Sequence, residues 1–516
     1  MNVRKAFFHF ASAVAFAITG LAGFPVNRAL AVHYYLDING TTTGSGVADG
    51  GSYIWGNAIW NTNANGTTTA PIAWPDGNNF PIFAAGTDAN NKGYTITAST
   101  NQTFAGLALQ TSGGGNGAGK SVTIAGAPGV VLSLFTNTGG QGFYVGGTAD
   151  QNLIISAAIG GDSVTPVVWQ GQLSGTAGSL YLYGNNTFAG GVDLNTTAGL
   201  NFNNANSFGT GPIRWGFTGG TATQFTLAAP AAAAPITIVN AMQTKSASTL
   251  NMASFAQPVT WSGAWSLATG VSTLAVQSGV NTTISGTISG TDSTSALVKS
   301  SAGKLILSGA NTFAGGTTVS GGTLEMSGAS ASLGTGNVFV SGNGTSLAID
   351  SGVANALPDT ATVSLSGFAM LNVGAGENDR VSTLILDGAQ QPNGTYGSSQ
   401  SGAVNKLDFY FAGTGIITVG PPILAGDYNG NGVVDAADYV AWRNNVGQPS
   451  QTLPNDTTGV IVGDVQYNLW RGNFGNTVPA PGAGSSLDSA AVPEPSTIGL
   501  VVISFIALFA MKRTEN

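Results

Sequence analysis

The chain has 516 residues, only 7% of them charged, and its formal net charge at pH 7 is −8. This balance leaves no basic footprint for nucleic acid, so nucleic-acid binding is not expected. There is no cysteine, and the only histidines are His9 and His33. This composition excludes disulfides and thiol catalysis and disfavours histidine-based triads and multi-histidine metal sites. The hydrophobic fraction of 42% is large enough for a folded core.

The N-terminus has the pattern of a secretory signal peptide. Arg4 and Lys5 precede an apolar run over 6–24, and Ala29-Leu30-Ala31 provides a cleavage site of the small-x-small type. We therefore expect 1–31 to be a signal peptide and the protein to be exported to the cell envelope, the cell surface or the extracellular matrix. A retained membrane helix is the alternative interpretation of this segment.

Residues 32–100 are predicted to form an N-terminal β cap. The segment places three tryptophans, Trp55, Trp60 and Trp74, among turn-forming residues. A stack of strands has open ends, and such ends need protection from pairing with other chains. The aromatic side chains of this segment are suited to close one end.

Residues 101–420 are predicted to form an all-β solenoid. The segment is rich in Gly, Thr, Ser and Asn, and short strand-like runs such as 304–308 and 383–387 alternate with Gly-containing turns. Asn-Thr-Phe-Ala-Gly-Gly occurs at 186–191 and again at 311–316. Repeats of this kind bury their apolar residues by stacking coil upon coil, so a parallel β-helix is the preferred fold. A chain of β-sandwiches is the alternative.

The repeated segment resembles the autotransporter-associated β-strand repeat. The likeness rests on Leu-Ile-Leu-Ser-Gly-Ala-Asn-Thr-Phe-Ala-Gly-Gly-Thr at 305–317 and on Leu-Gly-Thr-Gly at 333–336. The copy over 180–215 departs from the pattern, because Val192 and Asp193 take the threonine positions. The resemblance implies an exported, elongated stalk or passenger scaffold and no particular chemistry.

The segment Gly-Asp-Tyr-Asn-Gly-Asn-Gly-Val-Val-Asp-Ala-Ala-Asp at 426–438 concentrates carboxylates in a chain that otherwise contains few charges. Its oxygen-bearing residues have the spacing of an EF-hand calcium loop, with glycine at the sixth position. The usual glutamate at position 12 is replaced by aspartate. The candidate calcium ligands are Asp427, Asn429, Asn431, Val433 through its carbonyl oxygen, Asp435 and Asp438.

A helix is predicted after this loop, and the whole unit recurs further along the chain. Tyr439, Trp442 and Val446 follow helical spacing and have counterparts in the second copy, namely Tyr467, Trp470 and Phe474. The ligand positions of the second loop are poor, being Asn455, Thr457, Gly459, Gly463 and Gln466, with Asp456 and Asp464 one residue out of register. We therefore predict one calcium site and one degenerate partner.

A duplicated loop and helix without a leading helix resembles the type I dockerin over 424–477. In that family, calcium orders the paired helices and the module docks onto a cohesin domain, so the resemblance implies Ca2+ as the bound ion and a cohesin-like partner. The degenerate second loop departs from the two-calcium pattern. Residues 478–491 read as a linker.

The C-terminal residues 492–516 combine Val-Pro-Glu-Pro-Ser, an apolar run over 498–511 and a basic pair, Lys512 and Arg513. Fourteen helical residues span about 21 Å, which is short for a bilayer. This order of parts resembles the PEP-CTERM sorting signal, which implies recognition by an exosortase-like enzyme and a transient membrane helix. A plain C-terminal membrane helix is the alternative.

The sequence therefore predicts an all-β parallel β-helix with a small α-helical calcium-binding domain and a C-terminal membrane helix. Its expected function is that of a non-enzymatic surface scaffold or adhesin. The alternative is a polysaccharide-degrading or polysaccharide-binding β-helix, with extracellular polysaccharide as the partner. A glycosidase needs two facing carboxylates, and the candidates show no convergent spacing: Asp162, Asp193, Asp292, Asp350, Asp359 and Asp379. Four tryptophans could stack on sugar or belong to the core, with the core preferred: Trp169, Trp215, Trp261 and Trp265.

Overall fold

The computed structural model describes residues 31–477, with gaps at 68–69, 84, 86–87, 90–91, 110–120, 136–140, 146–150, 162–165, 172–177, 217–223, 421–423, 450–451, 454 and 457. Apart from residue 31, the predicted signal peptide lies outside the described residues, as do the linker, the sorting signal and the predicted membrane helix over 498–511. Within the described ranges, no helix is long and apolar enough to cross a membrane.

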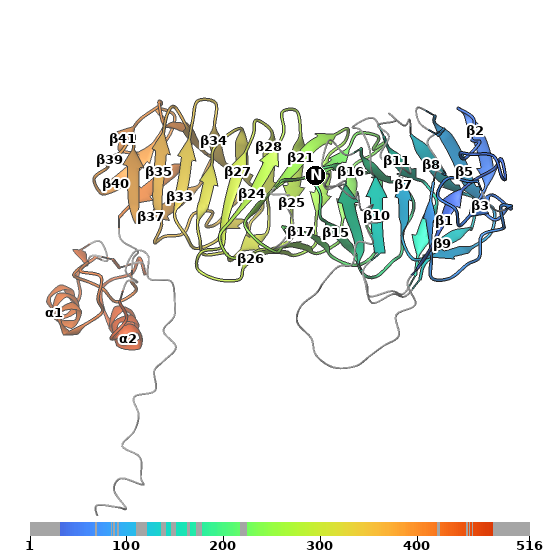
Figure 1. The fold of residues 1–516 in the computed structure, drawn as a ribbon. Helices are drawn as coiled ribbons and strands as arrows, with labels where there is room; N and C mark the ends of the chain where they lie inside the picture. The colour runs from blue at the N-terminus through green and yellow to red at the C-terminus, as the bar shows by residue number, and fades with distance from the viewer. Residues whose placement is uncertain are drawn as a thin grey trace, which may run out of the picture.

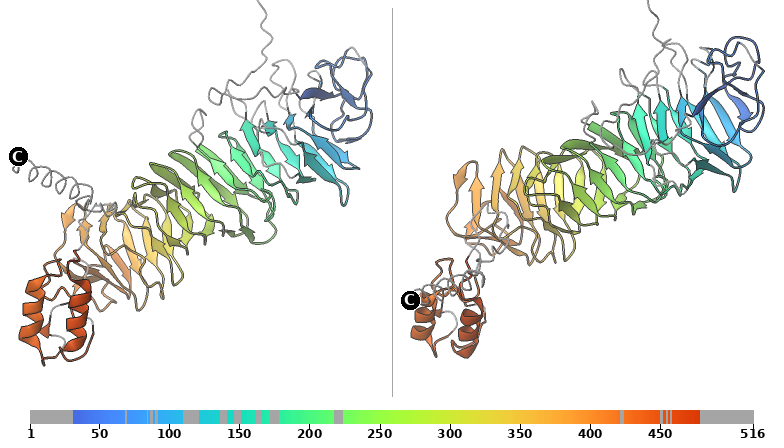
Figure 2. Two further views of the ribbon diagram at one scale, coloured as in Figure 1. Left: turned by 90° about the horizontal axis from the view of Figure 1, so that it is seen from below. Right: turned by 60° about the horizontal axis from the view of Figure 1, so that its bottom comes forward.

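Strands of successive coils pair in parallel and build an elongated β-helix (Figures 1 and 2). In the middle of the molecule the chain visits three sheets in turn through β25 (Asn281–Ile284), β26 (Ile288–Gly290) and β27 (Ala296–Ser300), and β28 (Lys304–Leu307) returns to the first. Each coil of this region adds one strand to the eight-stranded sheet and one to the fifteen-stranded sheet. The parallel β-helix is thereby confirmed, and the β-sandwich alternative is wrong, because sandwich sheets are built from antiparallel pairs.

The described strands form six sheets. The fifteen-stranded sheet contains, in spatial order, β2 (Gly51–Ile54), β5 (Tyr94–Ala98), β8 (Val122–Gly126), β11 (Leu153–Ile155), β14 (Leu180–Leu182), β16 (Gly199–Phe202), β18 (Gln224–Ala229), β21 (Ser248–Phe255), β24 (Val271–Val276), β27, β30 (Thr317–Val319), β33 (Val338–Ser341), β35 (Thr362–Ser366), β38 (Thr383–Leu386) and β39 (Ala389–Gln390). The eleven-stranded sheet contains β26, β23 (Trp265–Leu267), β20 (Met242–Thr244), β17 (Ile213–Trp215), β15 (Val192–Leu194), β13 (Val167–Gly171), β10 (Gln141–Val145), β7 (Leu107–Leu109), β4 (Asn79–Ile82), β1 (Val32–Leu36) and β3 (Trp60–Asn61).

The eight-stranded sheet contains β19 (Ile236–Ile238), β22 (Val259–Trp261), β25, β28, β31 (Thr323–Met326), β34 (Ser346–Ile349), β36 (Met370–Val373) and β42 (Phe411–Gly413). The three smaller sheets are β12 (Ala158–Gly160), β9 (Val131–Leu134) and β6 (Gln102–Phe104); β29 (Ala310–Asn311) and β32 (Ser332–Leu333); and β37 (Asn378–Val381), β43 (Ile416–Val419), β40 (Gly394–Gly397) and β41 (Asn405–Lys406).

The register between strands sets the length of a coil. Val259 pairs with Thr282 and Thr282 with Leu305, so these two coils have the same length. Leu305 in turn pairs with Leu324, and the coil between them is shorter. The difference arises in the turns, because the strands stay in register. The two copies of the Asn-Thr-Phe-Ala-Gly-Gly motif therefore lie several coils apart.

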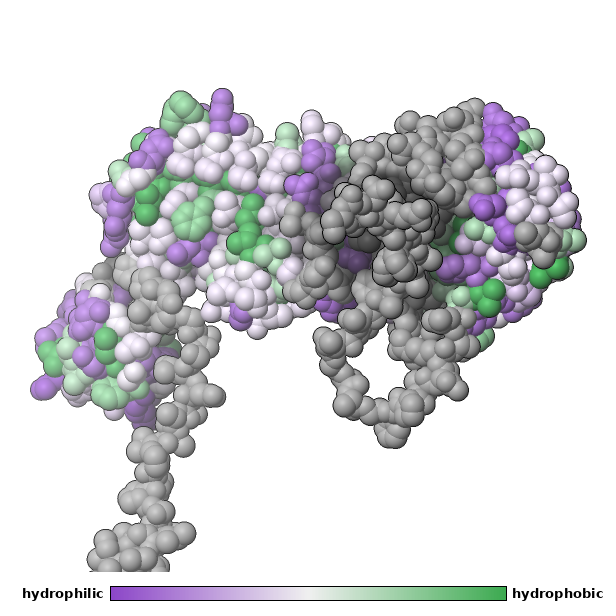
Figure 3. Space-filling view, viewed as in Figure 1, coloured by the Kyte–Doolittle hydropathy of each residue, from purple (hydrophilic) through white to green (hydrophobic). Residues whose placement is uncertain are grey.

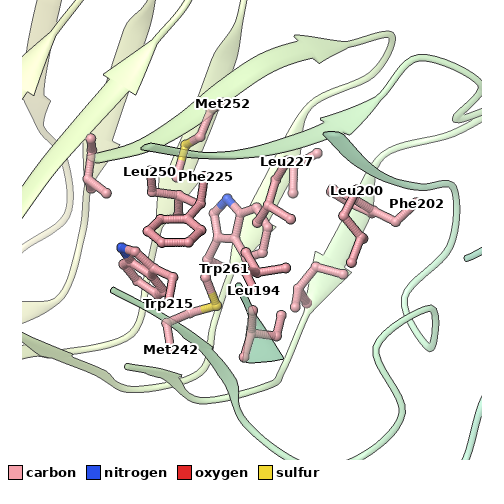
Figure 4. Packing of buried hydrophobic residues seen from close by; sticks show 14 of the residues in the cluster. Leu194, Leu200, Phe202, Trp215, Phe225, Leu227, Met242, Leu250, Met252 and Trp261 are labelled. Carbon is pink, nitrogen blue, oxygen red and sulfur yellow. The ribbon is translucent and has the colours of Figure 1, made fainter. Parts of the chain in front are cut away.

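Inward side chains of all coils form one continuous hydrophobic cluster that extends from Leu36 to Val419. The close view in Figure 4 shows Trp215, Phe225 and Trp261 packed together in the interior beside two methionines. The four tryptophans in question, Trp169, Trp215, Trp261 and Trp265, are at most 1% exposed. The prediction that they belong to the core is confirmed, and they cannot serve as a sugar-stacking platform. On the face shown in Figure 3, the coloured surface of the solenoid is mainly neutral or hydrophilic, with scattered hydrophobic residues.

The asparagine of the repeated Asn-Thr-Phe-Ala-Gly-Gly motif bridges neighbouring coils. Asn311 accepts a hydrogen bond from the backbone N–H of Ile288 (2.8 Å) and donates to the carbonyl oxygen of Ser332 (2.7 Å). Asn186 makes the equivalent two bonds in its own copy. The motif therefore recurs because its buried amide satisfies the backbone of the coils before and after it.

Both ends of the β-helix are closed. At the N-terminal end, Trp55, Trp60 and Trp74 pack ring against ring with centroid distances of 4.9–5.5 Å, and β3 pairs antiparallel with β1. The parallel pairing that builds the β-helix begins within the segment predicted to be a cap, because β2 pairs in parallel with β5. At the C-terminal end, β39 pairs antiparallel with β38, and β40 with β43.

The two helices described by the structure, α1 (Ala436–Asn445) and α2 (Asp464–Asn473), follow the β-helix in sequence and contact one another. Their small hydrophobic core consists of Tyr428, Leu453 and Val462. A hydrophobic cluster of three buried side chains is small for a folded unit, so other interactions must hold the helices in place.

Candidate metal centre

The predicted calcium loop leads directly into α1, and its two end carboxylates are buried. Asp427 is 2% exposed and Asp438 is fully buried. Asp435 is the N-cap residue of α1, and its carboxylate accepts a hydrogen bond from the N–H of Ala437 (2.7 Å). The helix thus begins inside the loop, as helix capping by aspartate favours.

Both end carboxylates bind the loop backbone. The Asp427 side chain accepts hydrogen bonds from the N–H groups of Gly430 (2.8 Å), Asn431 (3.1 Å) and Gly432 (2.8 Å). Asp438 accepts from the N–H groups of Asn429 (2.9 Å) and Asp435 (2.8 Å). The loop is therefore wrapped around the two carboxylates. Gly430 and Gly432 have φ angles of 73° and 84°, values that favour glycine.

The remaining predicted ligands line the same turn. Oδ1 of Asn429 accepts from the N–H of Asn431, and Oδ1 of Asn431 accepts from the N–H of Val433, each at 2.9 Å. Val433 also forms an antiparallel β-bridge with Thr477. The structure therefore gathers all six sequence-predicted residues in one loop.

The residues present fit a calcium ion. The loop offers carboxylate, amide and carbonyl oxygens, which are the hard ligands that calcium takes six to eight at a time. Within the described ranges, none of its three aspartates forms an ion pair with a lysine or arginine. The described residues also contain no group of three His, Cys, Asp or Glu side chains close enough to hold a metal by themselves. The asparagine and carbonyl oxygens would therefore be needed alongside the carboxylates.

In the second loop, a side-chain amide occupies the centre. The side-chain amide nitrogen of Gln466 donates to Oδ2 of Asp456 (2.9 Å), Oγ1 of Thr458 (2.7 Å) and the carbonyl oxygen of Val460 (3.2 Å). The amide oxygen of Gln466 accepts from the N–H of Gly463 (2.9 Å). An N–H donor group thus lies where three oxygens converge, the position that a cation takes in a calcium loop.

The sequence alignment of the two loops missed this arrangement. It assigned Asn455 to the first position, whereas the structure gives that role to Asp456. The second loop, from Asp456 to Gln466, is one residue shorter than the loop from Asp427 to Asp438. A one-residue deletion before the helix could have been found only by allowing a gap between the copies.

Each helical unit donates an equivalent tryptophan hydrogen bond to the other. The indole N–H of Trp442 donates to the carbonyl oxygen of Gly463 (2.9 Å), and that of Trp470 donates to the carbonyl oxygen of Asp435 (2.7 Å). The two donors occupy equivalent positions in the two copies, and so do the two acceptors. Each tryptophan thus binds the N-cap residue of the opposite helix, so the start of α1 and the packing of α2 are coupled.

Four aromatic side chains extend this interface: Tyr439, Trp442, Tyr467 and Trp470. Their ring centroids lie 5.0–6.3 Å apart. Tyr428 donates its hydroxyl to the carbonyl oxygen of Gln466 (2.7 Å). Burial, together with the nearby carboxylates of Asp456 and Asp438, raises the pKa of Tyr428. Both calcium-loop copies therefore contribute to a single folding unit.

Three of the carboxylates considered for an enzymatic site, Asp193, Asp292 and Asp379, have structural partners. Asp193 pairs with Arg214, and Asp379 accepts from the N–H groups of Ala356 and Leu357. The hydroxyls of Thr269 and Thr294 donate to Asp292 and lower its pKa to about 2. Asp162 lies outside the described residues. A shallow groove of about 610 Å³ on the solenoid has no carboxylate in its lining, which consists of Gln243, Thr244, Lys245, Ser246, Ser266, Ala268, Thr269 and Thr291.

Comparison with known families agrees with the repeat architecture. Residues 177–196 and 297–326 match the passenger-associated-transport-repeat. These two segments contain the two copies of the Asn-Thr-Phe-Ala-Gly-Gly motif, so the resemblance to autotransporter-associated repeats is confirmed for them. None of the curated proteins and none of the solved structures compared with the chain gives a significant match.

Proposed function

We propose that the chain is an exported, non-enzymatic scaffold of the cell surface, in which a β-helical stalk carries a calcium-ordered docking module. Two observations support the interpretation of the β-helix as a stalk: the passenger-associated repeat and a continuous core that contains the candidate tryptophans. A passenger repeat implies export to the cell surface. In such a protein the solenoid supplies length and the terminal module supplies the contact with a partner.

The loop from Asp427 to Asp438 carries the proposal. Asp427, Asn429, Asn431, the carbonyl of Val433, Asp435 and Asp438 would hold Ca2+, which supplies the positive charge that the buried carboxylates lack among the described residues. Loss of the calcium ion would leave the buried carboxylates of Asp427 and Asp438 without a compensating positive charge, which is a costly arrangement. We therefore propose that calcium stabilises α1 and, through the exchanged tryptophan contacts, also α2.

A cohesin-like domain is the proposed partner, on the strength of the dockerin-like duplication over 424–477. The C-terminal segment 492–516 is proposed to act as a sorting signal for an exosortase-like enzyme, with its helix in the membrane before removal. Extracellular polysaccharide remains the alternative partner. A non-enzymatic role is proposed because the passenger-associated repeat points to a surface scaffold.

The test is calcium binding to the full chain, measured by isothermal titration calorimetry and by tryptophan fluorescence after removal of metal with a chelator. We expect an ion to bind at this loop, and Asp427→Ala and Asp438→Ala each to abolish that event. Asp464→Ala is the matched control, because Asp464 is an exposed aspartate of the second copy. If Asp427→Ala binds calcium as the unmodified chain does, the loop is a polar turn and the docking module loses its support.

A further inference from the structure

Three aromatic side chains form a cluster at the C-terminal end of the β-helix: Phe368, Phe409 and Tyr410. The ring centroids of Phe368 and Phe409 lie 5.2 Å apart, and those of Phe409 and Tyr410 lie 4.9 Å apart. Phe368 belongs to the turn between β35 and β36, whereas the other two residues lead into β42, which pairs with β36. The stacking of β42 on β36 therefore brings together rings that are distant in the sequence.

The two phenylalanine rings are exposed, although burial would stabilise the fold. Phe368 is 60% exposed and Phe409 is 52% exposed. Phe368 also has a φ angle of 67° and follows Gly367, whose φ is 62°. A left-handed backbone costs a residue with a side chain about 1–2 kcal/mol, whereas glycine adopts it freely. The turn thus keeps a phenylalanine that is strained and gains little burial in return, which is typical of a functional residue.

A fixed carboxylate lies beside the rings. Asp387 accepts a hydrogen bond at Oδ2 from the hydroxyl of Tyr410 (2.8 Å) and another at Oδ1 from the backbone N–H of Gly367 (3.0 Å). Asp387 is nevertheless exposed, and a carboxylate oxygen accepts more than one hydrogen bond. The cluster therefore offers ring faces together with oxygens that can accept hydrogen bonds from a ligand.

The size and charge of the cluster favour a sugar over a protein as its ligand. An aromatic side chain has roughly 150–250 Å² of surface, so the exposed parts of Phe368 and Phe409 together amount to about 200 Å². A stable protein interface buries about 800 Å² on each partner. A pyranose ring is smaller, and it has an apolar C–H face that stacks on aromatic rings and hydroxyls that donate to carboxylates. Asp387 and Asp408, which are both exposed, repel an acidic sugar and leave a neutral one preferred.

We propose that this cluster binds a neutral polysaccharide. Sugar rings stack on Phe368 and Phe409, a sugar hydroxyl donates to Asp387, and Tyr410 holds that carboxylate in position. The site belongs to the β-helix and includes no residue of the calcium loop, so either site can exist without the other. It gives the scaffold a contact with extracellular glycan that is separate from its docking module.

The test is native affinity electrophoresis of the full chain in gels that each contain one neutral polysaccharide: hydroxyethylcellulose, galactomannan, arabinoxylan or dextran. A chelator in every gel removes any contribution from calcium. We expect at least one of these polymers to retard the chain, and Phe409→Ala to weaken that binding tenfold or more. Phe339→Ala is the matched control, because Phe339 is an exposed phenylalanine of β33 outside the cluster, and it should bind as the unmodified chain does.

Phe368→Gly separates binding from folding. Glycine accepts the left-handed turn, so we expect the melting temperature of this variant to equal or exceed that of the unmodified chain, while its binding falls tenfold or more. Equal retardation of Phe368→Gly and the unmodified chain would overturn the proposal, as would the failure of all four polymers to retard the unmodified chain. If no polymer binds and Phe409→Ala abolishes a self-association seen in sedimentation velocity, the cluster receives a second copy of the chain and the proposal is wrong.

Discussion

Polar residues inside the solenoid are satisfied mainly by the backbone of its turns. Lys299 is fully buried, and its ammonium group donates to the carbonyl oxygens of Ser300 (3.1 Å), Ser301 (2.6 Å) and Gly321 (2.6 Å). Burial lowers the pKa of Lys299 to about 8. Asp379 provides the opposite case, a buried acceptor for two backbone N–H groups. Their sequence context does not show these partners in full, because Gly321 for Lys299 and Ala356 and Leu357 for Asp379 come from another coil.

Asp379 should make the stability of the solenoid depend on pH. Burial raises its pKa from 3.8 to about 6, so the folded state binds the proton more tightly than the unfolded state does. Its contribution is therefore fully present below pH 3.8 and is lost as the pH rises through 6. We expect Asp379→Asn to gain about 1–3 kcal/mol of unfolding free energy relative to the unmodified chain between pH 4 and pH 7.

The measurement is urea unfolding of both chains at several pH values. Subtracting the two profiles removes the titration of the other carboxylates. Asp464→Asn serves as the control, because it removes an exposed carboxylate in the first turn of α2. A difference between Asp379→Asn and the unmodified chain that does not change with pH would show that Asp379 is ionised equally in both states.

At the scale of elements, the sequence predicted the duplicated loop and helix but not how the second loop is held. The repeat predicts that Trp442 and Trp470 are equivalent. Their hydrogen bonds to Gly463 and Asp435, each in the opposite unit, agree with that equivalence. The sequence did not predict the role of Gln466, because a glutamine at a ligand position indicates a weakened metal site and does not reveal that its amide nitrogen is a hydrogen-bond donor. Hydrogen-bond direction is visible only once the three acceptors are in place.

Gln466→Glu should therefore make the second loop dependent on calcium. The substitution replaces the central N–H donor by a carboxylate facing Asp456, Thr458 and the carbonyl of Val460, so the loop loses the hydrogen bonds of that amide nitrogen and gains repulsion. Without calcium we expect a loss of about 2–4 kcal/mol in the stability of the helical pair. Added calcium should restore much of this loss by occupying the loop centre.

Helicity by circular dichroism, recorded with chelator and with calcium during thermal unfolding, provides the measurement. Gln448→Glu is the matched control, because it introduces the same charge at an exposed position. If Gln466→Glu is as stable as the unmodified chain in chelator, the amide does not act as the internal substitute for a cation.

At the scale of the whole molecule, repeats and composition were sufficient to predict a parallel β-helix, because segments that cannot bury their apolar residues alone must stack. The three-strand coil of the central region could not be predicted, since it depends on how each Gly-containing turn redirects the chain. A longer coil, from Thr282 to Leu305, is followed by a shorter one, from Leu305 to Leu324, without a change in strand register. The closing hairpin at the C-terminal end likewise depends on turn conformation.

The turn between β38 and β39 should therefore control self-association. Asp387 and Gly388 form a two-residue turn with φ angles of 44° and 84°, the left-handed conformation typical of tight hairpins. A Cβ atom on Gly388 meets no neighbour, so the Cβ of Gly388→Val adds no clash and the left-handed backbone adds strain of about 1–2 kcal/mol. We expect β39 to detach, the edge of β38 to become available for pairing, and the chain to associate more strongly than the unmodified protein.

Sedimentation velocity over a range of concentrations measures this self-association, with Ala389→Val as the control that keeps the turn intact. Equal sedimentation of Gly388→Val and the unmodified chain would mean that the end of the β-helix is protected by β40 and its neighbours without the help of β39.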